Sequence, residues 1–197
     1  MKKTKPHRNK TLADKSAKKT KSTQETAPIL AEQEQTLTIQ QAIDLAVEHH
    51  NSGDLPKAEG IYQQILQADP NQPVALHLLG VIAHQVGKND IAVDLINKAL
   101  TINPHFFKAH YNLGIILQAL GRIDEAEEHF SRAIVIKPDY FEAHSNLGNI
   151  FKILGKTDEA VVSYKKAIAI KPDYAEAYSN LGNAFKELGQ LDESIAS

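Results

Sequence analysis

The sequence predicts an all-α fold, a right-handed α-solenoid of about four and a half helix-turn-helix units. The first observation behind this is a period of 34 residues, and a fixed period of roughly 20–50 residues is typical of stacked supersecondary units. The second is helical spacing of apolar residues inside each period, and the third is the lack of any segment that alternates with period two long enough to predict a strand. The residues that recur every 34 positions are Pro70, Pro104, Pro138 and Pro172, then Gly80, Gly114, Gly148 and Gly182, and finally Gly53, Gly87, Gly121, Gly155 and Gly189.

One unit, residues 107–140, shows how each element is predicted. Ala109, Leu113 and Leu117 have the spacing of an amphipathic helix, and Gly121 is expected to end that helix in a left-handed conformation. A second helix follows, with Ala126, Phe130 and Ala133 on one face. It is expected to stop before Pro138, which has no backbone donor.

Acidic residues near the predicted helix starts suggest how these starts are stabilised. Asp124 and Glu125 suit the positive end of the second helix. Asp139 is expected to cap the next first helix, with Glu142 three residues further on. The pair Asp173 and Glu176 repeats that arrangement one period later.

Small residues recur where the two helices of a unit would touch. Gly114, Ala126 and Ala133 each have a glycine or alanine counterpart in the units 73–106 and 141–174. Because a glycine inside a helix costs about 1 kcal/mol relative to alanine, its recurrence indicates a close helix contact.

Composition narrows the class of protein. The 197 residues are 42% hydrophobic and 23% charged, so the chain can bury a core, and without cysteine it has neither disulfides nor thiolate metal sites. No stretch approaches the roughly 18–20 apolar residues of a membrane span, and no apolar segment follows the basic N-terminus as in a secretory signal. We therefore expect a cytoplasmic protein with no membrane insertion.

Charge is distributed unevenly along the chain. Residues 1–21 carry a net charge of +8, whereas residues 22–197 carry −10. Residues 1–36 are expected to form a disordered, Lys-rich tail because they contain few large apolar residues. The tail is read as a solubilising leader or as a contact for nucleic acid, anionic lipid or an acidic partner. Nucleic acid is the less favoured partner, since no aromatic residue lies among the lysines to stack on bases.

The predicted repeats fill residues 37–197. They are residues 39–72, 73–106, 107–140, 141–174 and a truncated unit at 175–197. A solenoid needs a polar terminal unit, because each repeat buries its faces only against its neighbours. We therefore expect a fragment of a longer protein, with self-association through the incomplete last repeat as one consequence.

The repeated pattern resembles the tetratricopeptide repeat (TPR). The pentatricopeptide repeat is a poorer match, because it has 35 residues and lacks this set of glycine, alanine and proline. The residues that carry the resemblance in one unit are Leu147, Gly148, Phe151, Gly155, Ala160, Tyr164, Ala167 and Pro172.

The resemblance implies that the first helices line a concave groove that binds extended peptide or protein segments. Among the candidate groove residues, three asparagines recur in register, and two roles for them are equally favoured. They either grip a peptide backbone or bond neighbouring helices to hold the superhelix. The candidates are Tyr111, Asn112, Gln118, Asn146, Asn149, Lys152, Asn180, Asn183 and Lys186, and the asparagines in register are Asn112, Asn146 and Asn180. The same face also carries His77, Val81, His84, Ile115, Ser145 and Ser179.

Parts of the sequence also resemble two specialised uses of the tetratricopeptide repeat. The asparagine series resembles the one in the TPR arm of O-linked N-acetylglucosamine transferases, and residues 75–100 resemble early repeats of bacterial SPINDLY-type proteins. A carboxylate clamp for chaperone tails is also considered. Asn149 and Asn180 match its asparagines, but Ser145 stands where a lysine is expected.

Catalytic and metal-binding chemistry is not predicted. The chain has no phosphate-binding glycine loop, no nucleophile elbow and no HExxH. His110 and His144 are one period apart, too far to share an ion, and His77 and His84 lack a third ligand. The predicted function is a non-enzymatic interaction scaffold without cofactor or metal. The alternative is the substrate-recruiting arm of a larger glycosyltransferase.

Overall fold

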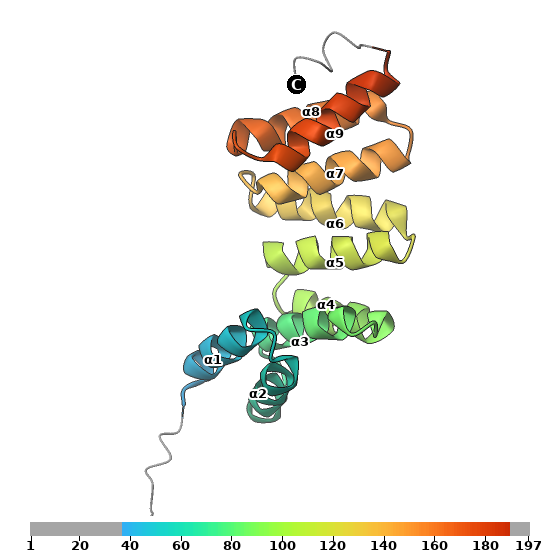
Figure 1. Cartoon of the computed structure of the whole chain (residues 1–197). Helices are drawn as coiled ribbons and strands as arrows, with labels where there is room; N and C mark the ends of the chain where they lie inside the picture. Colours follow the sequence, from blue (N-terminus) through green and yellow to red (C-terminus); the bar gives the residue numbers. More distant parts are fainter. Residues whose placement is uncertain (1–36, 190–197) are drawn as a thin grey trace, which may run out of the picture. The chain divides into compact units, whose positions relative to one another are not determined.

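The structure, a computed structural model, describes residues 37–189 of the chain. This part contains nine α-helices and no strand, which confirms the all-α prediction (Figure 1). The predicted tail at 1–36 and the second helix expected within 190–197 lie outside the described residues. The helices are α1 (Ile39–Asn51), α2 (Leu55–Ala68), α3 (Pro73–Gln85), α4 (Asn89–Ile102), α5 (Phe107–Ala119), α6 (Ile123–Ile136), α7 (Phe141–Ile153), α8 (Thr157–Ile170) and α9 (Ala175–Glu187).

Each tight turn between the helices of a repeat depends on a left-handed glycine. Gly121 has φ of +74°, which lets the backbone N–H groups of Gly121 and Arg122 reach back to carbonyls of α5, at 3.0 and 2.9 Å. A residue with a Cβ rarely adopts this conformation. The predicted helix end at Gly121 is therefore confirmed.

The predicted caps at Asp139 and Asp173 are wrong. The N-cap residues of α7 and α9 are Tyr140 and Tyr174, one position later, and neither makes a side-chain capping hydrogen bond. The Tyr140 ring packs 5.2 Å from the Phe107 ring and 4.9 Å from the Tyr111 ring, centroid to centroid. Packing of an aromatic ring thus takes the place of a polar cap at this turn.

In the repeats 107–140 and 141–174, the two helices meet where a glycine faces an aromatic ring. A Cβ added at Gly148 would lie 2.5 Å from a ring atom of Tyr164, and one at Gly114 would lie 2.8 Å from Phe130. Ala126 and Ala133 are fully buried beside the second contact. The close helix approach predicted from the small residues is confirmed.

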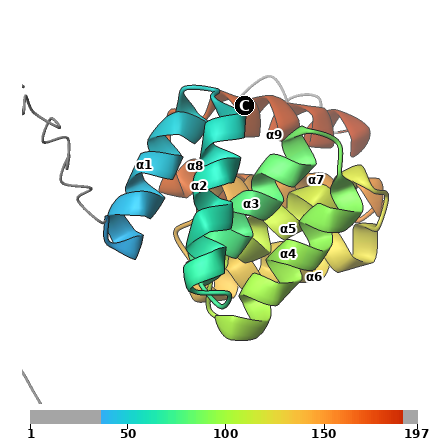
Figure 2. The same ribbon diagram turned by 90° about the horizontal axis from the view of Figure 1, so that it is seen from below.

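Successive repeats stack through both helices, but not equally. Each second helix packs on the first helix of the next repeat, and first helices also contact one another, α3 with α5 and α7 with α9 (Figures 1 and 2). Within residues 37–189, no pair of second helices is in comparable contact. First helices therefore line the inner side of the stack and second helices its outer side.

None of the helices α1–α9 is long and apolar enough to cross a membrane. The buried apolar residues of the described part form three clusters along the stack, and the largest extends from α3 to α7.

Candidate functional site

The inner face of the first helices is not equally accessible along the stack. His77 and Ser145 were predicted to face the groove, but they are 2% and 0% exposed. Tyr111, at the equivalent position between them, is half-buried. This position belongs to the contact between repeats because the aromatic N-cap residue of the following first helix packs against it, as the Phe106 ring does 4.8 Å from His77.

The three asparagines in register each bond a side chain of the preceding repeat. Asn112 Nδ2 lies 2.7 Å from His77 Nε2, and Asn146 Nδ2 donates to the Tyr111 hydroxyl at 3.0 Å. Both bonds connect first helices of neighbouring repeats across 35 residues of sequence. The sequence left two roles open for these asparagines, peptide binding and the bonding of neighbouring helices. The contacts seen here are those of the second role.

The third asparagine uses a different acceptor. Ser145 stands where Tyr111 and His77 stand in the earlier repeats, and its buried hydroxyl has no hydrogen-bond partner within residues 37–189. Asn180 Nδ2 instead donates to Asn149 Oδ1 at 3.2 Å, and the Tyr164 hydroxyl donates to the same oxygen at 2.7 Å. The asparagine pair of the considered carboxylate clamp is therefore already bonded within the stack.

Lys152 is also engaged between repeats. Its Nζ lies 2.8 Å from Glu187 Oε1 on α9, and its side chain is 24% exposed. This ion pair connects the C-terminal ends of two neighbouring first helices.

Three of the nine candidate residues have no such partner. Within residues 37–189, no side-chain hydrogen bond or ion pair involves Gln118, Asn183 or Lys186. Asn183 and Lys186 are exposed and Gln118 is half-buried. They present amide donors and acceptors and one cation, which suits the backbone and acidic groups of a peptide.

An aromatic edge that the sequence analysis missed lies at the start of the first helices. The Phe141 and Tyr174 rings pack 4.9 Å apart, and Lys171 Nζ lies 4.6 Å from the centroid of Phe141. Lys137 lies over Phe107 in the same way at 5.0 Å. The sequence could have predicted this edge, because an aromatic residue recurs every 34 positions at Phe106, Tyr140 and Tyr174.

The histidines form no metal site in the described part of the chain, where no group of three or more potential ligands comes together. Burial lowers the pKa of His77 to about 4, with a smaller effect from Lys108, so the ring is neutral near pH 7. His144 Nε2 donates to the Pro138 carbonyl at 2.9 Å. His110 and His129 contact one another, which the sequence analysis did not predict.

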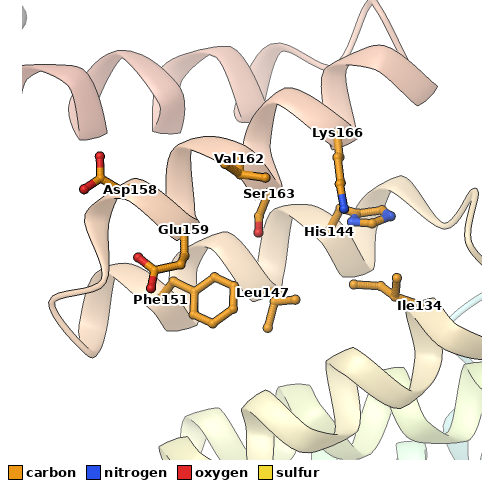
Figure 3. A pocket seen from close by; sticks show the side chains of 9 residues that line it. All are labelled: Ile134, His144, Leu147, Phe151, Asp158, Glu159, Val162, Ser163 and Lys166. Carbon is orange, nitrogen blue, oxygen red and sulfur yellow. The ribbon is translucent and has the colours of Figure 1, made fainter.

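The outer side of the stack carries pockets between second helices. One of about 370 Å³ lies between α6 and α8 (Figure 3). Leu147 and Phe151 of α7 line it together with Val162, while Glu159 and Lys166 lie along α8. Further pockets of about 360 and 260 Å³ lie between α4 and α6 and between α2 and α4. They follow from the wider spacing of the second helices.

Comparison with family models identifies the repeat. Models of the tetratricopeptide repeat match residues 73–106 and 107–140, and a TPR repeat model matches residues 148–189. The chain is a tetratricopeptide repeat protein. Tetratricopeptide repeats are non-catalytic scaffolds that bind peptides or proteins.

Solved structures agree with this assignment. A crystal structure of MamA is 29% identical, with a TM-score of 0.70, covering 78% of this chain and 90% of MamA. PilF of Pseudomonas aeruginosa shares 18% identity and a TM-score of 0.76, covering 80% of this chain and 72% of PilF. YrrB, described as a TPR protein with an unusual peptide-binding site, shares 21% identity and a TM-score of 0.67, covering 81% and 82%. No curated protein matches the chain by sequence.

Proposed function

We propose that the inner face of the stack formed by residues 37–189 binds an extended segment of a partner protein. The observation that carries this proposal is the division of the candidate residues into two groups. Six of them bond within the stack, whereas Gln118, Asn183 and Lys186 have no polar side-chain partner within residues 37–189. The first group fixes the spacing of the repeats, and the second contacts the ligand.

The chemistry of the second group indicates the kind of ligand. Asn183 and Lys186 are three residues apart on α9 and therefore lie on one side of that helix. An amide can bond the peptide backbone regardless of sequence, while a lysine favours an acidic side chain or a terminal carboxylate. Peptide binding by the TPR protein YrrB is consistent with this use of the fold.

An array of random linear peptides, probed with the full chain, tests the proposal. A double variant, Asn183→Ala with Lys186→Ala, should bind the captured peptides about ten-fold more weakly or worse, since a hydrogen bond to a charged group contributes roughly 1.5–3 kcal/mol. Lys98→Ala is the matched control, because Lys98 is exposed on the outer helix α4. Equal loss in both variants, or no loss in either, would rule out the inner face as the binding surface.

We do not advance the alternative of a glycosyltransferase arm. The three matched family models describe tetratricopeptide repeats, and none of them describes a transferase domain. A transferase domain in the same gene would be the observation that favours it.

A further inference from the structure

Two histidine rings meet inside the third repeat. His110 of α5 and His129 of α6 have their Nδ1 atoms 3.0 Å apart, and their ring centroids are 5.2 Å apart. Both side chains are half-buried. The contact lies directly between the two helices of one repeat.

The neighbours of His110 determine where the protons lie. His110 Nε2 is 3.1 Å from the Pro104 carbonyl oxygen, which can only accept a hydrogen bond. Nε2 must therefore carry the proton, and in the neutral ring Nδ1 is then an acceptor. It follows that His129 must carry its proton on Nδ1 and donate it to His110.

This arrangement tolerates one additional proton but not two. The first can bind at Nε2 of His129 and leaves the Nδ1–H···Nδ1 bond intact. The second has to bind at Nδ1 of His110, where it would place two N–H groups head to head and two cations in contact. A hydrogen bond between the rings would then be replaced by repulsion.

The surrounding charges do not compensate a second cation. The groups that act on the pair are His105, from the turn between α4 and α5, three side chains of α6, and Arg122 at the N-cap of α6. The carboxylates of Glu125 and Glu128 are balanced by the guanidinium groups of Arg132 and of Arg122 at the N-cap, with Glu125 bound to Arg122.

We infer that His110 and His129 form an acid-sensitive latch that holds α5 against α6 by one shared proton and opens when both rings become charged. Burial lowers the pKa of each ring below its ordinary value, in keeping with this geometry. The latch has consequences beyond its own repeat, because α5 also carries Asn112 and Tyr111, which bond the repeats on either side.

Imidazole nitrogen NMR of the full chain tests the shared proton directly. At pH 7.5 we expect His110 as the Nε2–H tautomer and His129 as the Nδ1–H tautomer, the less common form of free histidine. Resonances of α5 and α6 should broaden or shift together when the second proton binds on acidification. Finding His129 as the Nε2–H tautomer at pH 7.5 would overturn the inference.

A pair of matched variants tests the effect on stability. His129→Gln can still donate an N–H to His110 but cannot titrate, so its urea-unfolding midpoint should fall less between pH 7.5 and 5.5 than that of the native chain. His105→Gln removes an exposed histidine of the adjoining turn that acts on His110 only through its charge and as the smallest of the named effects, so its midpoint should fall nearly as much as that of the native chain. Equal pH dependence in all three proteins would contradict the latch, as would Zn²⁺ or Cu²⁺ binding that requires both rings. If the glutamine variant does not fold, the NMR result on the native chain decides.

Discussion

The contact within a repeat and the contact between repeats are built on different physics. Within a repeat, a glycine lets an aromatic ring approach the helix, as Gly148 does for Tyr164. Between repeats, a side-chain amide reaches the preceding first helix, as Asn146 does for Tyr111 at 3.0 Å. The first contact packs an aromatic ring against a glycine in both repeat 3 and repeat 4. The second is polar and changes its partner from repeat to repeat, so it can differ in strength along one stack.

The largest expected effect concerns a buried histidine between repeats 2 and 3. The pKa of His77 is about 4 in the fold and about 6.5 in an unfolded chain. Its neutral form is favoured by folding, so its contribution is complete above about pH 6.5 and is lost as pH falls toward 4. Linkage puts that loss at roughly 2–3 kcal/mol. Urea unfolding as a function of pH measures it.

The control for this prediction is a variant that cannot titrate. His77→Gln should show a flatter pH profile than the native chain over the same range, whatever its stability at pH 7. An unchanged profile would show that His77 does not sense pH in the fold.

Next in size is the contact within a repeat. Gly148→Ala would place a methyl group 2.5 Å from the Tyr164 ring, and such overpacking costs about 1–3 kcal/mol. Gly60→Ala in α2 is the matched control, because its added Cβ meets no atom within 4 Å. That change should stabilise the chain by about 0.5–1 kcal/mol through helix propensity. Thermal unfolding of both variants measures the two stability changes. Changes of the same sign would argue against the glycine–aromatic contact.

A smaller effect distinguishes two of the contacts between repeats. Tyr111→Phe removes the hydroxyl that accepts from Asn146 and should cost about 0.5–1.5 kcal/mol. Ser145→Ala, at the equivalent position, removes a buried hydroxyl that has no partner in the described part of the chain, and it should be neutral or stabilising. Chemical denaturation can compare the two. A larger cost for the serine change would mean that its hydroxyl is bonded after all.

The smallest effect belongs to the ion pair of Lys152 and Glu187. Its two side chains are 24% and 52% exposed, so solvent screens their interaction and we expect at most about 1 kcal/mol. A double-mutant cycle with both residues changed to alanine, measured at low and high salt, gives the coupling. Coupling that does not weaken with salt would mark the pair as effectively buried.

The sequence predicted the backbone better than the partners of its side chains. Gly121 and Gly148 could be placed because a left-handed turn and a close helix approach each demand glycine, whatever surrounds them. The caps at Asp139 and Asp173 were wrong because aromatic packing of the next residue fixes the turn. Contacts such as His110 with His129 depend on the distance between two helices, which residue spacing does not contain.

In the candidate site, too, the sequence predicted the position of each residue on the backbone but not the partner of its side chain. The period correctly placed its residues on the first helices, and Asn183 and Lys186 are exposed as a groove requires. It could not tell which of them bond within the stack, because the acceptor of each asparagine belongs to another repeat. At Asn180 the acceptor even differs from the one that register suggests, since the serine at that position is too short to reach it.

One triple variant, Asn112→Ala with Asn146→Ala and Asn180→Ala, tests most directly whether the asparagines hold the repeats together. Alanine is the better helix former, so loss of the three bonds must outweigh that gain. At about 0.5–1.5 kcal/mol a bond, we predict a lower melting temperature together with unchanged peptide affinity of the folded protein. Equal or higher stability with lost peptide binding would contradict the account and assign the asparagines to the ligand.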